Sequence, residues 1–194
     1  MARSRQAQII SGIAESAPSL IFLAMWRSNV DVELAGWTGA ILAFSLIFGF
    51  AALRIRFDPI LMGINAHMLL LAPIIHGAFV FGSADSARWL IDHAPTLVLV
   101  AIAVSMLSYQ VARRPQMEDA DLSPEAAYRI GWVMTAVAFA AVPWAIVNEG
   151  QSLIAVVLPI AGMFALRRYL LAREFDRRGG AAGVAVLTPA DAFE

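Results

Sequence analysis

The sequence predicts an all-α, polytopic membrane protein with six transmembrane helices. Of its 194 residues, 60% are hydrophobic and 15% are charged, and the mean hydropathy is +0.70. A soluble domain carries about 25% charged residues. The charges of this chain stand between long apolar runs, which is typical of a small membrane protein that forms one domain. The chain contains no cysteine, which excludes disulfides and thiolate metal sites.

The clearest predicted span covers residues 58–81. Asp58 is a favourable N-cap residue, and Pro59 follows at the one position where proline helps a helix to begin. A helix of this length reaches about 36 Å, and the hydrocarbon core of a bilayer is about 30 Å thick. The span carries Asn65, His67 and His76 within its apolar run. We therefore expect it to face other helices, because polar groups that face lipid are costly.

The other five spans are predicted at 9–26, 34–53, 95–111, 130–147 and 153–171. Residues 1–8 form a basic segment before the first span, and 172–194 form a tail that we expect to be disordered after 178. A signal peptide is the alternative for the first span, but Glu15 interrupts its apolar region and no small-x-small cleavage site precedes Arg27. In the loop 82–94, Trp89 and its two apolar neighbours suit the membrane interface. Ser123-Pro124-Glu125 is a helix start signal.

The arginines predict the orientation of the chain. All 14 basic residues are arginine. With six spans, twelve of them fall on the side of the two termini, and only Arg27 and Arg88 fall on the other side. Short loops rich in arginine stay in the cytoplasm. Both termini are therefore predicted to be cytoplasmic.

Two segments of the sequence resemble each other. Residues 15–25 read ESAPSLIFLAM and residues 92–102 read DHAPTLVLVAI. One interpretation is that spans one to three and four to six are copies of a three-helix unit, which makes a 3+3 inverted repeat as in many transporters. The other is that apolar segments share letters by chance.

Three polar residues could meet near the cytoplasmic side. Glu15 lies about six residues into the first span, and Asn65 and His67 lie about six and eight residues into the third. An intramembrane carboxylate is a functional candidate, and a histidine is a natural proton partner for it. The alternative is that Glu15 is hydrogen-bonded to Asn65 and only holds the helices together.

A second polar group is predicted near the outer side. His76 lies near the end of the third span, and Asp92 and His93 precede the fourth. Two histidines at similar depth could ligate a haem or a metal ion, but His93 is expected in a loop, so we predict neither cofactor. The sequence also contains no hydrolase, kinase or nucleotide-binding motif, so no catalytic residue is predicted. The net charge of -1 gives no reason to expect nucleic acid.

Span two has a face of small residues, formed by Gly36, Gly39 and Ala43. Their spacing of three and four places them on one side of a helix, where small side chains permit close contact with a neighbouring helix. We expect this face to pack inside the bundle.

The layout resembles the intracellular septation protein A family over residues 16–173. The resemblance lies in six short spans with cytoplasmic ends, Pro18 in the first span, an inner loop that begins Arg113-Arg114-Pro115, and Trp132 leading the fifth span. The stretch 57–63 (FDPILMG) is also similar to small bacterial membrane proteins without an assigned activity. The resemblance implies a bacterial inner-membrane protein that acts in cell division and envelope maintenance through protein partners, without catalysis.

Three functions are therefore open. The first is a non-enzymatic inner-membrane protein that works through helix contacts with other membrane proteins, and that is able to form oligomers. The second is a small proton-coupled transporter that uses Glu15 and His67 near one gate and His76 and Asp92 near the other. The third is an accessory subunit of a larger energy-transducing membrane complex. The lipid bilayer is a partner in all three.

Overall fold

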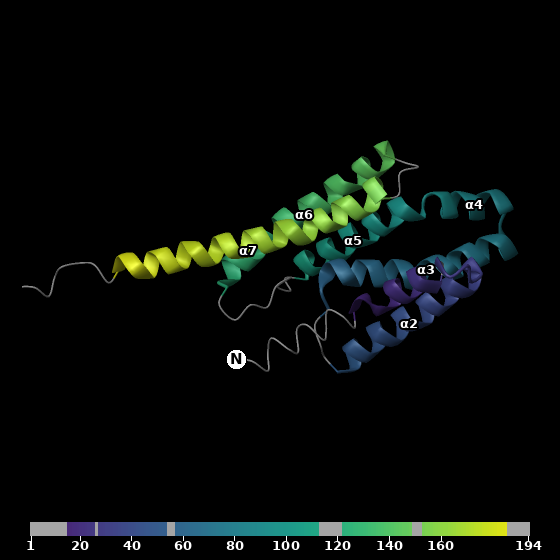
Figure 1. The fold of residues 1–194 in the computed structure, drawn as a ribbon, viewed down its shortest axis with the longest axis horizontal. Coiled ribbons are helices and arrows are strands. Elements are labelled where there is room, and N and C mark those ends of the chain that lie inside the picture. The colour runs from purple at the N-terminus through teal and green to yellow at the C-terminus, as the bar shows by residue number, and fades with distance from the viewer. Residues whose placement is uncertain (1–14, 26, 54–56, 113–121, 149–152, 186–194) are drawn as a thin grey trace, which may run out of the picture.

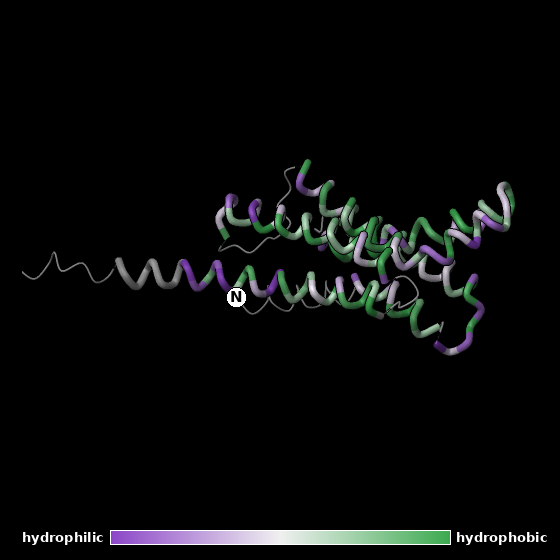
Figure 2. The backbone as a smooth tube through the Cα atoms, turned by 90° about the horizontal axis from the view of Figure 1, so that it is seen from above, coloured by the Kyte–Doolittle hydropathy of each residue, from purple (hydrophilic) through white to green (hydrophobic). Residues whose placement is uncertain are grey.

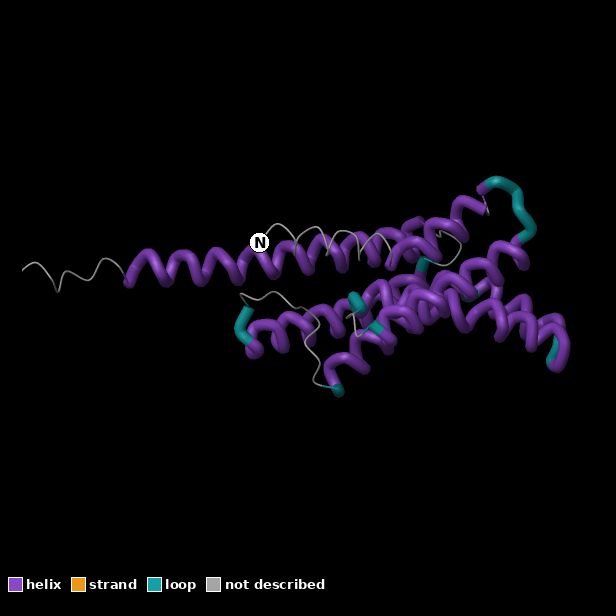
Figure 3. The backbone as a smooth tube through the Cα atoms, turned by 90° about the horizontal axis from the view of Figure 1, so that it is seen from below, coloured by secondary structure: helices purple, strands orange, loops and turns teal. Residues whose placement is uncertain are grey.

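The computed structural model describes residues 15–25, 27–53, 57–112, 122–148 and 153–185, with the backbone alone for 153 and 178–185. Within these ranges the chain is helical between short connections and has no strand (Figures 1 and 3). The helices are Glu15–Met25, α2 (Val32–Ala52), α3 (Pro59–Phe81), α4 (Ala84–Asp92), α5 (Ala94–Val111), α6 (Pro124–Val147), the π-helix η1 (Leu153–Val157) and α7 (Leu158–Ala185).

Five helices are long and apolar enough to cross a membrane, which indicates a multi-pass membrane protein. They are Val32–Ala52, Pro59–Phe81, Ala94–Val111, Pro124–Val147 and Ile154–Arg177, and they confirm helices at the second to sixth predicted spans. The first predicted span is described only from Glu15 to Met25, a shorter apolar helix, because 9–14 and 26 lie outside the described residues. The count of six spans, the cytoplasmic termini and the inverted repeat stay predictions.

The helices pack in an order that follows the chain. α3 packs against α2 on one side and α5 on the other, α5 packs against α6, and α7 packs against α6 and η1 (Figure 1). Buried apolar side chains of α3, α5, α6 and α7, among them Ile60, Leu99, Met134 and Met163, form the core. These helices thus form one connected bundle.

Small residues allow the closest helix contacts. A Cβ atom added to Gly63 of α3 would lie 2.4 Å from Ile102 Cα of α5, so only glycine fits there. The predicted small-residue face of α2 is confirmed as a packing face, because Gly39 and Ala43 are buried and a Cβ on Gly36 would lie 3.6 Å from Ala72 Cβ of α3. Phe22 approaches Gly39 from the helix Glu15–Met25, so three helices meet at this position.

The long helices alternate in direction. The end of α2, the start of α3, the end of α5 and the start of α6 lie toward one end of the bundle, and α4 and the end of α6 lie toward the other (Figure 1). We call the end that holds the start of α3 the inner end and the opposite one the outer end. This arrangement agrees with the predicted loop pattern.

Two parts of the chain differ from expectation. The predicted loop 82–94 contains helix α4, which Ser83 caps by accepting a hydrogen bond from the backbone N–H of Ser86 (3.1 Å). α7 continues beyond the predicted sixth span to Ala185, so its backbone is helical over 179–185, where we expected disorder. Figure 2 shows that α7 turns polar where it leaves the other helices. The rest of the tail, the segment 1–8 and the loop 113–121 lie outside the described residues.

Candidate functional site

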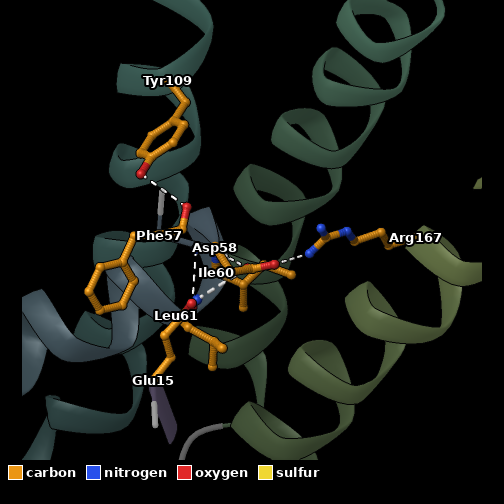
Figure 4. A network of polar contacts seen from close by, with 7 residues as sticks. All are labelled: Glu15, Phe57, Asp58, Ile60, Leu61, Tyr109 and Arg167. Carbon is orange, nitrogen blue, oxygen red and sulfur yellow. Dashed lines mark hydrogen bonds and ion pairs between the residues drawn. The ribbon is translucent and has the colours of Figure 1, made fainter. Parts of the chain in front are cut away.

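Parts of the chain that lie far apart in the sequence meet at the start of α3 (Figure 4). Asp58 caps the helix as predicted, and its Oδ1 accepts hydrogen bonds from the backbone N–H groups of Ile60 (2.9 Å) and Leu61 (3.5 Å). Pro59 fills the first helical position, where its missing N–H is not needed. The cap directs one carboxylate oxygen to its own helix and leaves the other for a distant partner.

Glu15 reaches this cap from the first helix. Its Oε2 accepts a hydrogen bond from the backbone N–H of Asp58 (3.1 Å), and only 4% of the residue is exposed. The positive end of the α3 dipole favours a negative charge here. The buried carboxylate therefore joins the helix Glu15–Met25 to the start of α3.

Asn65 makes the second link between these two helices. Its Nδ2 donates to the backbone carbonyl oxygens of Glu15 and Leu61, each at 2.8 Å. The residue is 1% exposed, and its Oδ1 has no hydrogen-bond partner among the described residues. Glu15 thus lies beside the first two turns of α3, where the predicted meeting of Glu15 and Asn65 takes place.

Replacing Asn65 with leucine should lower the free energy of unfolding by only about 1 kcal/mol. The variant loses the bond to Glu15, but it also removes a buried acceptor that has no partner, so the two effects partly cancel. The thermal unfolding midpoint of the purified protein in detergent measures the change. A collapse of the fold would show that the amide does more than join two helices.

Two side chains from the second half of the chain complete the network. Arg167 of α7 forms an ion pair with Asp58 Oδ2, and both side chains are largely buried. The Tyr109 hydroxyl of α5 donates to the carbonyl oxygen of Phe57 (3.1 Å). α7 does not pack directly on α3, so Arg167 spans the distance between them with its side chain. We call Glu15, Asp58, Asn65, Tyr109 and Arg167 the inner polar network.

His67 does not belong to this network. It lies two residues beyond Asn65 on α3, which places it near the opposite face of the helix. The side chain is half-buried, and the hydrogen bonds of the described residues link Glu15 to Asp58 and Asn65 without it. The structure therefore brings together two of the three residues of the predicted inner group.

The predicted outer group divides between different partners. His76 Nδ1 lies 3.5 Å from Glu33 Oε1 of α2, and its ring packs edge-on against Trp37 at 5.8 Å. His93 stacks on Trp89 with the ring centres 4.4 Å apart, and its Nδ1 donates to the Trp89 carbonyl oxygen (2.8 Å). Asp92 is exposed at the end of α4. Among the described residues, His, Asp and Glu side chains form no group that could hold a metal ion.

Comparison with protein-family models, curated proteins and solved structures gives no match for this chain. The inner polar network is therefore the feature of the chain from which its function can be inferred. Arg167 and Tyr109 were missed from the sequence, where Arg167 reads only as the first basic residue after an apolar run. The single available signal was that a carboxylate at a buried helix start requires a counter-charge.

Proposed function

We propose that this protein is a non-enzymatic, multi-pass protein of the bacterial inner membrane that works through helix contacts with other membrane proteins. We assign it to septation or envelope maintenance on the resemblance described above. The observation that supports this role, which we call a scaffold role, is that Glu15 makes a structural contact between helices. Its buried carboxylate accepts the N–H of Asp58, and Asp58 in turn pairs with Arg167.

These contacts favour a structural role for Glu15 over a role in proton transport. A carboxylate that couples proton flow has to exchange its proton with both sides of the membrane in turn. Glu15 instead joins the helix Glu15–Met25 to the start of α3, where its carboxylate and its carbonyl oxygen both accept hydrogen bonds. Charged and polar groups that pair with one another inside a membrane protein stabilise its helix contacts.

Proton-coupled transport is the second candidate, because a buried carboxylate beside an Asp–Arg pair is also a feature of ion pathways. The variant Glu15→Gln separates the two functions. Glutamine keeps a side-chain oxygen for the Asp58 N–H but cannot carry a proton. We expect Glu15→Gln to fold and to retain its membrane partners, with proton flux into protein-containing liposomes unchanged from the wild type.

The matched variant Glu15→Leu loses the acceptor oxygen, so it should be less stable than Glu15→Gln. Proton flux by the wild type that is abolished in Glu15→Gln, with the fold intact, would instead establish transport.

The septation role also predicts a division or envelope defect when the gene is deleted, and normal cell division and a normal envelope would count against it. An accessory role predicts stoichiometric co-purification with one large energy-transducing complex.

A further inference from the structure

Three helices, α2, α3 and α5, indicate where the outer edge of the hydrocarbon core lies along the bundle. α2 begins at Val32 after its cap Asp31, whose side chain accepts hydrogen bonds from the backbone N–H groups of Glu33 (2.8 Å) and Leu34 (3.2 Å). Glu33 lies opposite His76 of α3. The start of α2 is thus level with His76, and the polar groups there mark the outer edge of the hydrocarbon core.

The length of α3 gives the same edge independently. From Asp58, about 20 helical residues cover the ~30 Å of the hydrocarbon core, which places its outer edge near Ala78. On the neighbouring helix, α5 extends from Val111 back to Ala94, about 27 Å. The count along α3 leaves residues 79–81 at its tip outside the core, and the start of α5 lies close to the same edge.

The segment 78–92, which we call the outer hairpin, exposes aromatic and charged groups together. Phe81 is 90% exposed and Trp89 54% exposed. The charged side chains of Asp85 and Arg88 are also exposed, whereas Ala87 faces the bundle and is fully buried. α4 packs against α3 and α5, so the hairpin is held to the ends of both spans.

We propose that the outer hairpin is a lipid anchor that sits in the headgroup layer of the outer leaflet, with Phe81 and Trp89 directed to its boundary with the acyl chains. The three residues of α3 beyond Ala78 extend about 4.5 Å, which fits within a headgroup layer about 5–7 Å thick on each side. Tryptophan is favoured at this depth because its ring is apolar and its N–H is polar. Arg88 matches lipid phosphates in charge, and Asp85 matches headgroup amines.

Trp89 is in contact with His93. His93 stacks on its ring and donates to its carbonyl oxygen, and His93 also precedes the first residue of α5. A ring that is stacked on a neighbouring side chain has less conformational entropy to lose when it enters the interface. This inference depends on insertion into a membrane and not on the function proposed above.

Site-directed spin labelling tests the anchor, and the absence of cysteine in the chain makes it direct. We would label Val80→Cys and Ile91→Cys in the full-length protein, in vesicles of phosphatidylcholine with a minority of phosphatidylglycerol. Collisions with oxygen and with a water-soluble nickel complex report depth. Val104→Cys, exposed in the middle of α5, is the control for the core, and Ser28→Cys, exposed before α2, is the control for water.

Both hairpin labels should give an oxygen-to-nickel accessibility ratio between those of the two controls. Nickel accessibility equal to that of Ser28→Cys would show that the hairpin projects into water, and protection from both reagents would show that protein covers it. Either result overturns the anchor.

A second variant tests the aromatic residue itself. Adding Trp89→Ala to the Ile91→Cys protein should raise its nickel accessibility at least twofold, whereas Phe44→Ala, an exposed aromatic within the span α2, should not. An unchanged value in Trp89→Ala would remove Trp89 from the anchor.

Discussion

Replacing Gly63 with alanine is expected to destabilise the bundle more than any other single methyl group added to a described glycine. The new Cβ would lie 2.4 Å from Ile102 Cα and 2.8 Å from Ile102 N, and backbone atoms cannot move aside as a flexible side chain can. α3 and α5 would have to separate at the centre of the core. Overpacking of this kind lowers the free energy of unfolding by about 1–3 kcal/mol.

Gly77 provides the matched control on the same helix. A Cβ there meets nothing within 4 Å, so Gly77→Ala should leave stability unchanged or raise it by up to about 1 kcal/mol, since alanine is the better helix former. Thermal unfolding in detergent compares the two variants. Equal midpoints would mean that α3 and α5 do not approach each other as closely as described.

Removing the charge of Arg167 should have the second large effect. Arg167→Leu leaves the Asp58 carboxylate without its counter-charge in a largely buried position. Breaking a buried pair from one side destabilises a protein by about 3 kcal/mol. The neighbouring Arg168→Leu changes the same charge at an exposed position and should cost far less.

A double variant shows whether the effect belongs to the pair. Asp58→Asn retains an N-cap side chain of similar quality but carries no charge. We expect Asp58→Asn combined with Arg167→Leu to be more stable than Arg167→Leu alone, because the uncompensated charge is gone. Stabilities that simply add would show that Asp58 and Arg167 do not interact. Chemical denaturation of the four proteins gives this coupling energy directly.

The long helices were predictable because each corresponds to one continuous run of apolar residues. Asp58-Pro59 and Ser123-Pro124 each mark a helix start, and both caps are present in the structure. The sequence predicts a loop at α4, because nine residues with three charges give no membrane signal and a single capping serine is a weak indication of a helix. Local patterns therefore predict long spans better than short connecting helices.

The inner polar network was only half predictable. Glu15 and Asn65 stand out because polar residues in apolar runs are rare, and depth alone brought them together. Arg167 is 109 positions from Asp58, and their pairing depends on how α7 lies against α6. His67 shows the opposite error, since similar depth did not place it on the same face as Asn65. The position of a residue along a span can be predicted from the sequence, whereas its contacts with residues of other helices depend on how the helices pack.

The most direct measurement of a scaffold role is a tagged purification from native membranes in mild detergent, with the bound proteins identified by mass spectrometry. We predict division or envelope proteins in fixed proportion to the wild type and to Glu15→Gln, and fewer of them with Glu15→Leu. A protein that purifies alone, and that carries a proton flux which Glu15→Gln abolishes, would contradict the scaffold role and establish transport.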